Sequence, residues 1–329
     1  MILITGATGF LGHNLVPRLR AAGYAVRALA RPSSDTTFLQ TLGVELAYTP
    51  DISDTDALIA ACQGCDTVIH AAGLFRFWGD LPDFWRTNVG GTAAALEAAS
   101  SNGVKRFIHI STLAVIGKTP SQAIITEETT CRPLEHYQRT KYEAEQLARH
   151  YHKTQGLPVL VLRPGAFYGP WGHYAFNRFF FEEPLRGWRI KVDNGRYITF
   201  PVFVADVAQA VMLALDKGEP GQIYNICGQS LDHNSVNAIV SDLAGISQWR
   251  FNIPRQLVVA LAAAWTFLSR FTGREPFYPI NMEPYVFQDW HVSTEKAERD
   301  LGFCPTPFAI GAKETLDWYW GQGILKRKT

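Results

Sequence analysis

The sequence has 329 residues, 47% of them hydrophobic, and its 31 basic side chains almost balance its 30 acidic ones to leave a formal net charge of +1. A chain of this length can bury a sizeable core in one large domain, or in a domain with an appended lobe. The balanced charges argue against a nucleic-acid-binding protein, which needs a clustered basic face.

Strand-like and helix-like segments alternate through the first half of the chain. Apolar runs predict strands at residues 2–5, 25–30, 66–72, 106–112 and 158–165. Helical patterns lie between them, at residues 12–23, 54–64, 88–103 and 138–156. This alternation predicts right-handed strand–helix–strand units and a parallel sheet with helices on both faces.

After about residue 165 the pattern becomes irregular, rich in aromatic residues and interrupted by proline and glycine. We expect a nucleotide-binding domain at residues 1–165 and a smaller substrate-binding lobe at residues 166–329, partly interwoven with it. The cleft between the two parts is the expected active site.

The longest apolar stretch runs from Leu257 to Leu268. It is too short to span a bilayer, which takes about 20 residues, so we expect no transmembrane segment. The stretch is either a buried helix, or an apolar cap over the active site or a contact with a membrane surface.

The spacing of the five cysteines does not match a disulfide framework. Cys62 and Cys65 form a CxxC, but a metal site would need a second such pair or nearby histidines. We expect free thiols and no metal site. We also expect a cytoplasmic protein, because the first strand begins at Ile2 with no signal peptide before it.

The first strand runs into "TGATGFLG", which contains Gly6, Gly9 and Gly12. Gly6 permits a tight turn, Gly9 lets the backbone approach a pyrophosphate, and Gly12 lets the next helix pack against the sheet. That helix begins near Phe10 and would direct free N–H groups at the phosphates. The strand–turn–helix context therefore indicates dinucleotide binding.

The glycine spacing resembles that of short-chain dehydrogenases/reductases, and "GATGFLG" resembles in particular their extended branch, the NAD-dependent epimerase/dehydratase family. The segments "PDISD", "HAAG", "HYQRTKYEAE" and "RPGAFYGP" match the family in the same order. The resemblance implies an α/β fold, with a Rossmann doubly wound parallel sheet and a smaller mixed α/β C-terminal lobe. It also implies an NAD(P)-dependent oxidoreductase.

The residue at the end of the second strand bears on the choice of cofactor. An NAD-specific site has an acidic residue there for the ribose 2′-hydroxyl, whereas this chain has Ala30 followed by Arg31. A guanidinium with Ser33 and Ser34 nearby suits a 2′-phosphate. We expect NADP, with NAD as the alternative.

The resemblance assigns further cofactor contacts. It implies that Asp51 binds the adenine amino group, that Ile52 packs on the ring, and that Asn88 has a mainly structural role. The residues expected to contact the cofactor are Gly6, Thr8, Gly9, Phe10, Leu11, Arg31, Asp51, Ile52, Ala71, Ala72, Gly73, Ser111, Tyr137, Lys141, Pro164 and Gly165.

Tyr137 and Lys141 share one face of a predicted helix, because side chains four residues apart are neighbours on a helix. A tyrosine ordinarily has a pKa of about 10. We expect Lys141, with a nicotinamide cation, to lower the pKa of Tyr137 so that the phenol can act as an acid and base. His136 should point elsewhere.

A hydroxyl at the end of the preceding strand completes the catalytic group that the resemblance implies. In "STLAVIG", Thr112 falls on the family's catalytic hydroxyl position and Ser111 on the adjacent cofactor side. Ile116 stands where the family often has a tyrosine, which removes one polar group but leaves the catalytic group of Thr112, Tyr137 and Lys141.

The segments near the expected cleft are aromatic. Sugar-nucleotide enzymes of the family commonly carry an arginine where Thr199 stands and a histidine where Phe203 stands, and dehydratases have an acidic pair where this chain has Leu113 and Ala114. Aromatic clusters suit flat or apolar ligands. The side chains expected to face the substrate are Phe75, Phe77, Trp78, Phe167 and Tyr168.

These features are most similar to the dihydroflavonol reductase and 3β-hydroxysteroid dehydrogenase-like group, and to the hopanoid-associated sugar epimerase-like proteins beside it. The resemblance implies hydride exchange between NADP(H) and a secondary alcohol, ketone or aldehyde of a hydrophobic substrate. An NAD(P)-dependent sugar or sugar-nucleotide epimerase and a non-catalytic NADP sensor stay open as alternatives. The resemblance also implies a homodimer formed by helices near residues 88–102 and 137–155.

Overall fold

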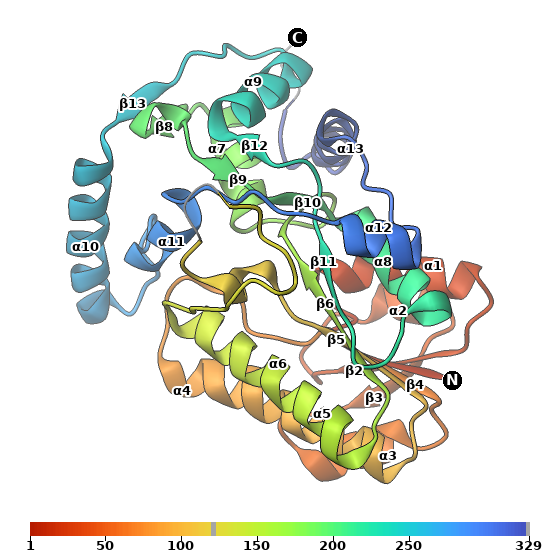
Figure 1. Cartoon of the computed structure of the whole chain (residues 1–329). Helices are drawn as coiled ribbons and strands as arrows, with labels where there is room; N and C mark the ends of the chain where they lie inside the picture. Colours follow the sequence, from red (N-terminus) through yellow and green to blue (C-terminus); the bar gives the residue numbers. More distant parts are fainter. Residues whose placement is uncertain (120–122, 327–329) are drawn as a thin grey trace.

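The computed structural model describes residues 1–119 and 123–326, and its centre is a seven-stranded parallel sheet (Figure 1). The strand order is β11-β6-β5-β4-β1-β2-β3. The strands are β1 (Ile2–Thr5), β2 (Val26–Ala30), β3 (Glu45–Tyr48), β4 (Thr67–His70), β5 (Arg106–Ile110), β6 (Val159–Pro164) and β11 (Ile223–Ile226). The predicted Rossmann fold is confirmed, and the strand order reverses between β1 and β4, where such sheets bind ligands.

Two strands of the sheet were absent from the sequence prediction. β3 lies at the edge and its four residues are only partly buried or exposed, so it lacks a continuous apolar run. β11 comes from the irregular second half of the chain, yet it pairs with β6.

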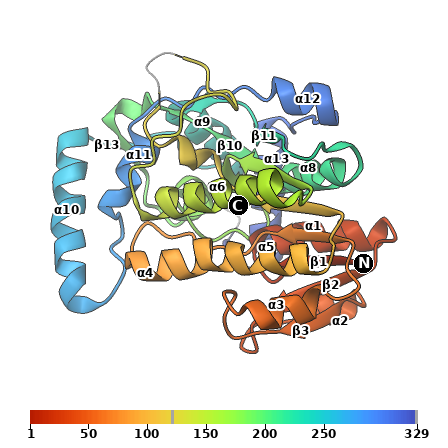
Figure 2. The same cartoon turned by 60° about the horizontal axis from the view of Figure 1, so that its bottom comes forward.

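Helices cover both faces of the sheet (Figures 1 and 2). One layer consists of α1 (Phe10–Ala21), α8 (Val204–Lys217), α12 (Glu295–Leu301) and α13 (Phe308–Gly321). The other consists of α3 (Thr55–Cys62), α5 (Gly91–Ser101) and α6 (His136–Gln155). Ile2 and Ile4 point into the first core and Leu3 into the second, as the alternation of side chains along a strand requires.

Short elements connect or extend these layers. They are α2 (Thr37–Thr41), α4 (Leu81–Phe84) and the π-helical turn η1 (Trp85–Gly90), which leads into α5. The 3₁₀ turn η2 (Leu113–Ile116) follows β5, and Thr112 is its N-cap.

The lobe formed by the second half contains three small strand pairs and four helices. The pairs are β7 (Ala166–Tyr168) with β10 (Pro201–Phe203), β8 (Ile190–Val192) with β13 (Phe251–Ile253), and β9 (Ile198–Thr199) with β12 (Leu231–Asp232). The helices are α7 (Glu183–Leu185), α9 (His233–Ala244), α10 (Arg255–Thr272) and α11 (Glu283–Val286), and short turns η3 (Arg178–Glu182), η4 (Asp193–Gly195) and η5 (Ile280–Met282) join them. The same half also supplies β11, which joins the central sheet, and α8, α12 and α13, which pack on its first face.

Helix α10 contains the long apolar stretch of the sequence and stands at the side of the lobe (Figures 1 and 2). Of its 18 residues only Val258, Ala262 and Ser269 are buried. The alternative of a buried helix is therefore wrong. Within the described residues, no helix has the length and hydropathy that crossing a membrane would require.

A buried ion pair joins α6 to the sheet. Arg163 on β6 donates from Nε to Glu145 Oε2 at 2.9 Å and from Nη2 to Glu145 Oε1 at 2.5 Å. Ser111 donates its hydroxyl to the same carboxylate at 2.7 Å. Both charged side chains are almost completely buried. The ion pair therefore fixes α6 against the carboxyl ends of β5 and β6.

We expect Glu145→Ala to lower the free energy of unfolding by about 3–5 kcal/mol, because it leaves the Arg163 guanidinium buried without its counter-charge. Urea unfolding at neutral pH measures the loss. Glu143→Ala removes an exposed carboxylate from the same helix and should cost less than about 0.5 kcal/mol. Equal losses for the two variants would contradict this role of the ion pair.

Candidate active site

The turn after β1 brings two stretches of backbone into close contact. Gly6 has a φ of +75°, and a Cβ there would lie 2.8 Å from the carbonyl carbon of Ala71 and from the nitrogen of Ala72. A Cβ on Gly12 would lie 2.0 Å from the carbonyl oxygen of Ala7. Both positions therefore require glycine, and Gly12 packs α1 against its own turn.

Helix α1 begins at Phe10 with Gly9 as its N-cap, and no side chain caps it. The first N–H groups of a helix have no acceptor within the helix. They point out of the end that carries the positive pole of the helix dipole, beside the open backbone of Gly6 and Gly9. This end of α1 can accept phosphate oxygens.

An exposed arginine follows the carboxyl end of β2. Arg31 is exposed and lines the same cavity as Ala30 and Ser34, and the described part of the chain gives its side chain no ion-pair partner. Asp51 also lines the cavity, where its carboxylate accepts the backbone N–H and the hydroxyl of Ser53 at 3.0 and 2.8 Å. These hydrogen bonds hold the pKa of Asp51 below its usual value, so a carboxylate faces this end of the cavity.

The loop after β4 is anchored by Asn88, which is buried. Its side-chain oxygen accepts the N–H of Leu74 at 2.7 Å, and its amide nitrogen donates to the Leu74 carbonyl at 3.2 Å and to the Thr140 hydroxyl at 3.0 Å. The bonds fix the backbone at Gly73 between β1 and α6. Asn88 has the structural role that the sequence predicts.

Helix α6 brings Tyr137 and Lys141 to the carboxyl end of β5. Lys141 donates from Nζ to the carbonyl of Ile110, the last residue of β5, at 2.6 Å. Thr112 lies just beyond this strand end, where its hydroxyl accepts the backbone N–H of Ala114 at 3.2 Å and lies close enough to Tyr137 to lower the pKa of the phenol. The side chains of Thr112, Tyr137 and Lys141 all line one cavity.

The predicted lowering of the Tyr137 pKa is absent from the chain on its own. Burial raises the pKa of the phenol, the Thr112 hydroxyl partly offsets this, and the charge of Glu135 raises it further. Burial also lowers the pKa of Lys141 to about 8, against a raising effect of Glu145. The ammonium donates to the Ile110 carbonyl instead of to the phenol, and burial is the largest influence on the pKa of Tyr137.

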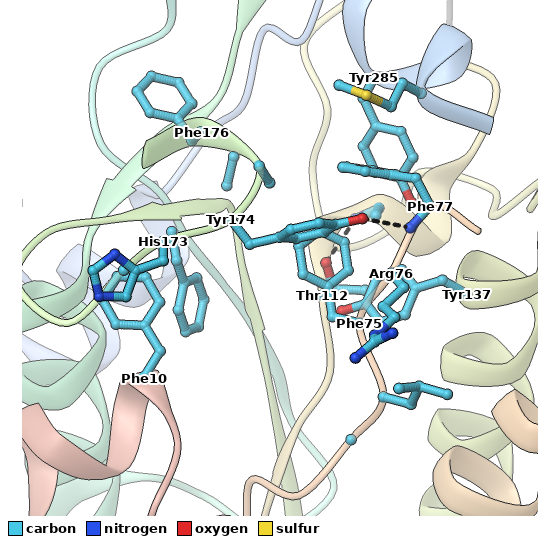
Figure 3. A pocket seen from close by; sticks show the side chains of 18 of the residues that line it. Phe10, Phe75, Arg76, Phe77, Thr112, Tyr137, His173, Tyr174, Phe176 and Tyr285 are labelled. Carbon is cyan, nitrogen blue, oxygen red and sulfur yellow. Dashed lines mark hydrogen bonds between the residues drawn. The ribbon is translucent and has the colours of Figure 1, made fainter. Parts of the chain in front are cut away.

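An aromatic wall stands beside the Tyr137 ring (Figure 3). The ring centroid of Phe75 is 4.7 Å from that of Tyr137 and 5.2 Å from that of Phe77. Tyr174 stacks on Phe77 with centroids 5.5 Å apart, and Tyr285 meets Phe77 edge-on. Phe75 thus lies against the phenol ring and Phe77 against Phe75, and their predicted contact with a substrate stays a prediction.

The Tyr174 hydroxyl connects three separate segments. It accepts the backbone N–H of Phe77 at 3.0 Å (Figure 3) and donates to the carboxylate of Glu275. A second link runs from the Tyr285 hydroxyl to Glu135 at 2.7 Å. Because Glu275 lies 101 residues from Tyr174, no local sequence signal could have revealed this connection.

One cavity of about 1530 Å³ contains most of the predicted site residues. That volume exceeds the roughly 300–1,000 Å³ of a typical ligand pocket, so a dinucleotide and a second ligand fit together. The predicted residues that line it are Gly6, Thr8, Gly9, Phe10, Leu11, Arg31, Asp51, Ile52, Ala71, Ala72, Gly73, Phe75, Phe77, Ser111, Thr112, Tyr137, Lys141, Gly165 and Phe167.

Three predicted residues lie outside the cavity. Tyr168 is buried in the core against Phe181 and Phe308, because neighbouring side chains on β7 point to opposite sides and Phe167 takes the cavity side. Pro164 is a buried residue within β6. Trp78 is half-buried outside the cavity, because the chain bends at residues 77–79. Ser111 lines the cavity, but its hydroxyl is engaged by Glu145.

The end of the cavity beyond Tyr137 is mostly apolar. Thr199 lines it, whereas Arg196 is directed to Asp193 at 2.7 Å. The cations at this end are Arg76 and Lys191. The apolar lining consists of Phe176, Phe179, Phe180, Trp188, Ile190, Val192, Phe200, Ile253, Val258, Leu261, Trp265, Phe277, Met282 and Val286.

The sequence profile of the NAD dependent epimerase/dehydratase family matches residues 2–227. The chain belongs to this family. It is an NAD(P)-dependent enzyme of the extended short-chain dehydrogenase/reductase type, as its glycine turn and its Tyr137–Lys141 pair indicate.

Two named relatives match this chain over nearly their whole length. It is 30% identical to sterol demethylase protein B of Methylococcus capsulatus, over 98% of this chain and 99% of that protein. It is also 30% identical to the 4-hydroxy-2-methyl-3-oxo-4-farnesyl-3,4-dihydroquinoline-1-oxide ketoreductase of Stigmatella aurantiaca, over 91% of this chain and 90% of the other.

A solved structure shows the same architecture with a bound cofactor. A double mutant of the dTDP-glucose 4,6-dehydratase DesIV of Streptomyces venezuelae, with NAD and a second ligand bound, superposes with a TM-score of 0.79 at 25% identity over 99% of both chains. The residues of the present chain fit such a dinucleotide: a Cβ would fill the approach at Gly6, the start of α1 is uncapped, and Lys141 faces the same cavity. When bound, the dinucleotide supplies or accepts a hydride.

We expect the contribution of Lys141 to the free energy of unfolding to increase as the pH rises. Lys141 has a pKa of about 8 when folded and 10.5 when unfolded, so between these values the unfolded chain binds more protons. The free energy of unfolding of the wild type, minus that of Lys141→Met, should therefore rise by about 3 kcal/mol between pH 8 and pH 10.5. Lys153→Met, at an exposed position on α6, should show no such rise. A flat difference for Lys141→Met would contradict the burial of this ammonium.

We expect Tyr174→Phe to loosen the loop that carries the aromatic wall, because the Phe77 N–H loses its acceptor. Amide hydrogen exchange in a peptide that covers residues 75–77 should accelerate about five-fold, as the loss of one hydrogen bond predicts. Mass spectrometry measures the exchange rate. Tyr24→Phe, on the far side of α1, is the control, and unchanged exchange in the Tyr174 variant would show that the bond does not hold the loop.

Proposed function

We propose that the chain is an NADP-dependent oxidoreductase that reduces a ketone or aldehyde of a hydrophobic substrate, or oxidises the corresponding alcohol. The observation that carries this proposal is the grouping of Thr112, Tyr137 and Lys141 in one cavity that is mostly apolar beyond Tyr137.

The composition of the cavity supports an apolar substrate. The rings of Phe75 and Phe77 bound the space beside Tyr137, and the far end is mostly aromatic and aliphatic. Desolvation of an apolar ligand against such a surface contributes favourably to binding. The names of two full-length relatives point the same way, since a sterol and a farnesyl-bearing quinoline oxide are both apolar.

The chemistry of the side chains suits reduction. Thr112 and Tyr137 would both hydrogen-bond a carbonyl oxygen and polarise it. If a bound cofactor delivered a hydride to the carbonyl carbon, the O–H bond of Tyr137 would break and its proton would pass to the carbonyl oxygen, which becomes the alcohol. Lys141 lies one turn along α6, where its ammonium donates to the Ile110 carbonyl, and with a cofactor bound its positive charge would favour the resulting phenolate. In the reverse direction, the phenolate takes the alcohol proton while the hydride returns to the cofactor.

The preference for NADP is proposed from Arg31. This guanidinium is exposed, forms no ion pair within the described chain, and directly follows Ala30, which stands where an NAD-specific enzyme needs a carboxylate. Ala30 supplies no such carboxylate. Ser34 adds a hydroxyl on the same cavity wall.

A sugar or sugar-nucleotide epimerase is the second candidate. The family name includes epimerases, and Arg76 and Lys191 are two cations that a phosphorylated sugar could meet. Against it, Arg196 is turned toward Asp193 and Thr199 offers no charge. A non-catalytic NADP sensor is the third candidate, and it gives no reason for the grouping of Thr112, Tyr137 and Lys141.

We further propose a cytoplasmic homodimer. Helices α5 and α6 lie side by side on one outer face of the sheet (Figures 1 and 2), and two such pairs can form a four-helix interface. Light scattering after size-exclusion chromatography measures the mass, and a monomer at all concentrations would contradict the proposal.

Cofactor absorbance decides between these candidates. With NADPH and a panel of apolar ketones, we expect net loss of reduced cofactor by the wild type. Tyr137→Phe should reduce the rate by at least about 100-fold, which is the usual contribution of a general acid, with NADPH binding retained. Product formed with no net cofactor change would indicate an epimerase, and a Tyr137→Phe variant with full activity would exclude this role for the phenol.

Arg31 tests the cofactor preference separately. Arg31→Ala should weaken NADPH binding by about ten-fold or more, because a charge-assisted hydrogen bond to a phosphate contributes about 1.5–3 kcal/mol. NADH binding should hardly change. Fluorescence titration gives both dissociation constants, and equal effects on NADH and NADPH would contradict the predicted 2′-phosphate contact.

A further inference from the structure

A large share of the chain's exposed hydrophobic side chains gather around α10. Outside the cavity, the α10 surface consists of Trp249, Phe251, Leu257, Phe267, Leu268 and Phe271. Phe271 is 77% exposed and Trp249 is 66% exposed. Isolated exposed apolar residues are normal, but a concentration of this kind marks an interaction surface.

The periodicity of α10 explains the exposure. Leu257, Leu261, Leu268 and Phe271 follow a spacing of four, seven and three residues and share one face of the helix. The adjoining strip of the helix surface carries the residues that pack on the lobe, with Val258 buried against the neighbouring core. A surface helix ordinarily turns a polar face to water, so the apolar outer face of α10 lacks its partner.

The same helix forms the wall of the substrate end of the cavity. Val258, Leu261 and Trp265 line the cavity, and Leu261 and Trp265 are also partly exposed to solvent. Trp188, next to the β8–β13 strand pair, is likewise exposed and lines the cavity. The mouth of the cavity is therefore apolar and continuous with the α10 surface.

Arginine supplies the charges of the segment that contains α10, and the nearest acidic residues on either side of it are Asp242 and Glu275. Residues 243–274 contain no aspartate or glutamate, but they contain Arg250, Arg255, Arg270 and Arg274. Arg250 is buried and Arg255 forms an ion pair with Glu283, whereas Arg270 and Arg274 are exposed near the C-terminal end of α10. An apolar face with aromatic residues, flanked by free arginines, has the composition of helices that lie in a membrane interface.

We propose that the α10 surface docks on the surface of an anionic phospholipid bilayer, with the cavity mouth facing the lipid. The apolar side chains would enter the boundary between headgroups and acyl chains, and Arg270 and Arg274 would meet lipid phosphates. A second copy of this chain fits less well, because residues 243–274 hold no acidic side chain to pair with the arginines of a facing α10.

This placement gives an apolar substrate a route from the bilayer into the cavity without crossing water. That consequence rests on the proposed function, but the docking itself does not. Vesicle binding measures the docking alone, without turnover, so its result and the cofactor assay can fail independently.

Flotation with phospholipid vesicles tests the proposal on the full chain. We expect binding to vesicles that contain phosphatidylglycerol, with weaker binding to pure phosphatidylcholine and at higher ionic strength. Phe267→Ser with Phe271→Ser should weaken binding about ten-fold or more, because two large apolar side chains stay in water. Arg270→Glu with Arg274→Glu should weaken binding to the anionic vesicles only.

Two measurements keep these results interpretable. The control Tyr48→Ser with Ile310→Ser removes exposed apolar side chains on β3 and α13 and should bind vesicles like the wild type. NADPH binding by each variant verifies the fold. Absence of vesicle binding by the wild type, equal loss in the control, or a dimer that dissociates in the Phe267 and Phe271 variant would each overturn the proposal.

Discussion

The active site depends on one steric constraint, the contact between the turn at Gly6 and the backbone of Ala71 and Ala72. Parallel pairing of β1 with β4 places Thr5 beside His70, so the two strands end together and their next residues meet. A side chain at Gly6 would push these segments apart. Its absence leaves a flat stretch of backbone across the switch point of the sheet, at the uncapped start of α1. The dinucleotide site follows from this contact.

The catalytic end of the site depends on how α6 is held. The buried Glu145–Arg163 pair and the bond from Lys141 to the Ile110 carbonyl fix two successive turns of the helix against β5 and β6. Burial has a cost there, because it disfavours the charged form of both Lys141 and Tyr137. As a result the pKa of Tyr137 is raised and that of Lys141 is lowered to about 8.

The sequence predicted the features that local chemistry determines. The glycine turn, the i, i+4 pair of Tyr137 and Lys141, and the helix–strand alternation all depend on residues close together in the chain. The prediction was wrong for Tyr168. Packing decides which side chains of the short strand β7 face the core, and the local sequence does not. It could not include the bond of Tyr174 to Glu275, because that contact depends on how the second half folds back over the first. It also left the environment of Leu257–Leu268 open, since an apolar helix in a lobe and one on its surface have the same composition.

A crystal structure of the chain with NADPH tests the central claim most directly. The account predicts pyrophosphate oxygens within hydrogen-bonding distance of the backbone N–H groups at the start of α1, and the nicotinamide ring beside the hydroxyl of Tyr137. A cofactor bound elsewhere in the cavity, or a Tyr137 side chain directed away from the nicotinamide, would contradict it.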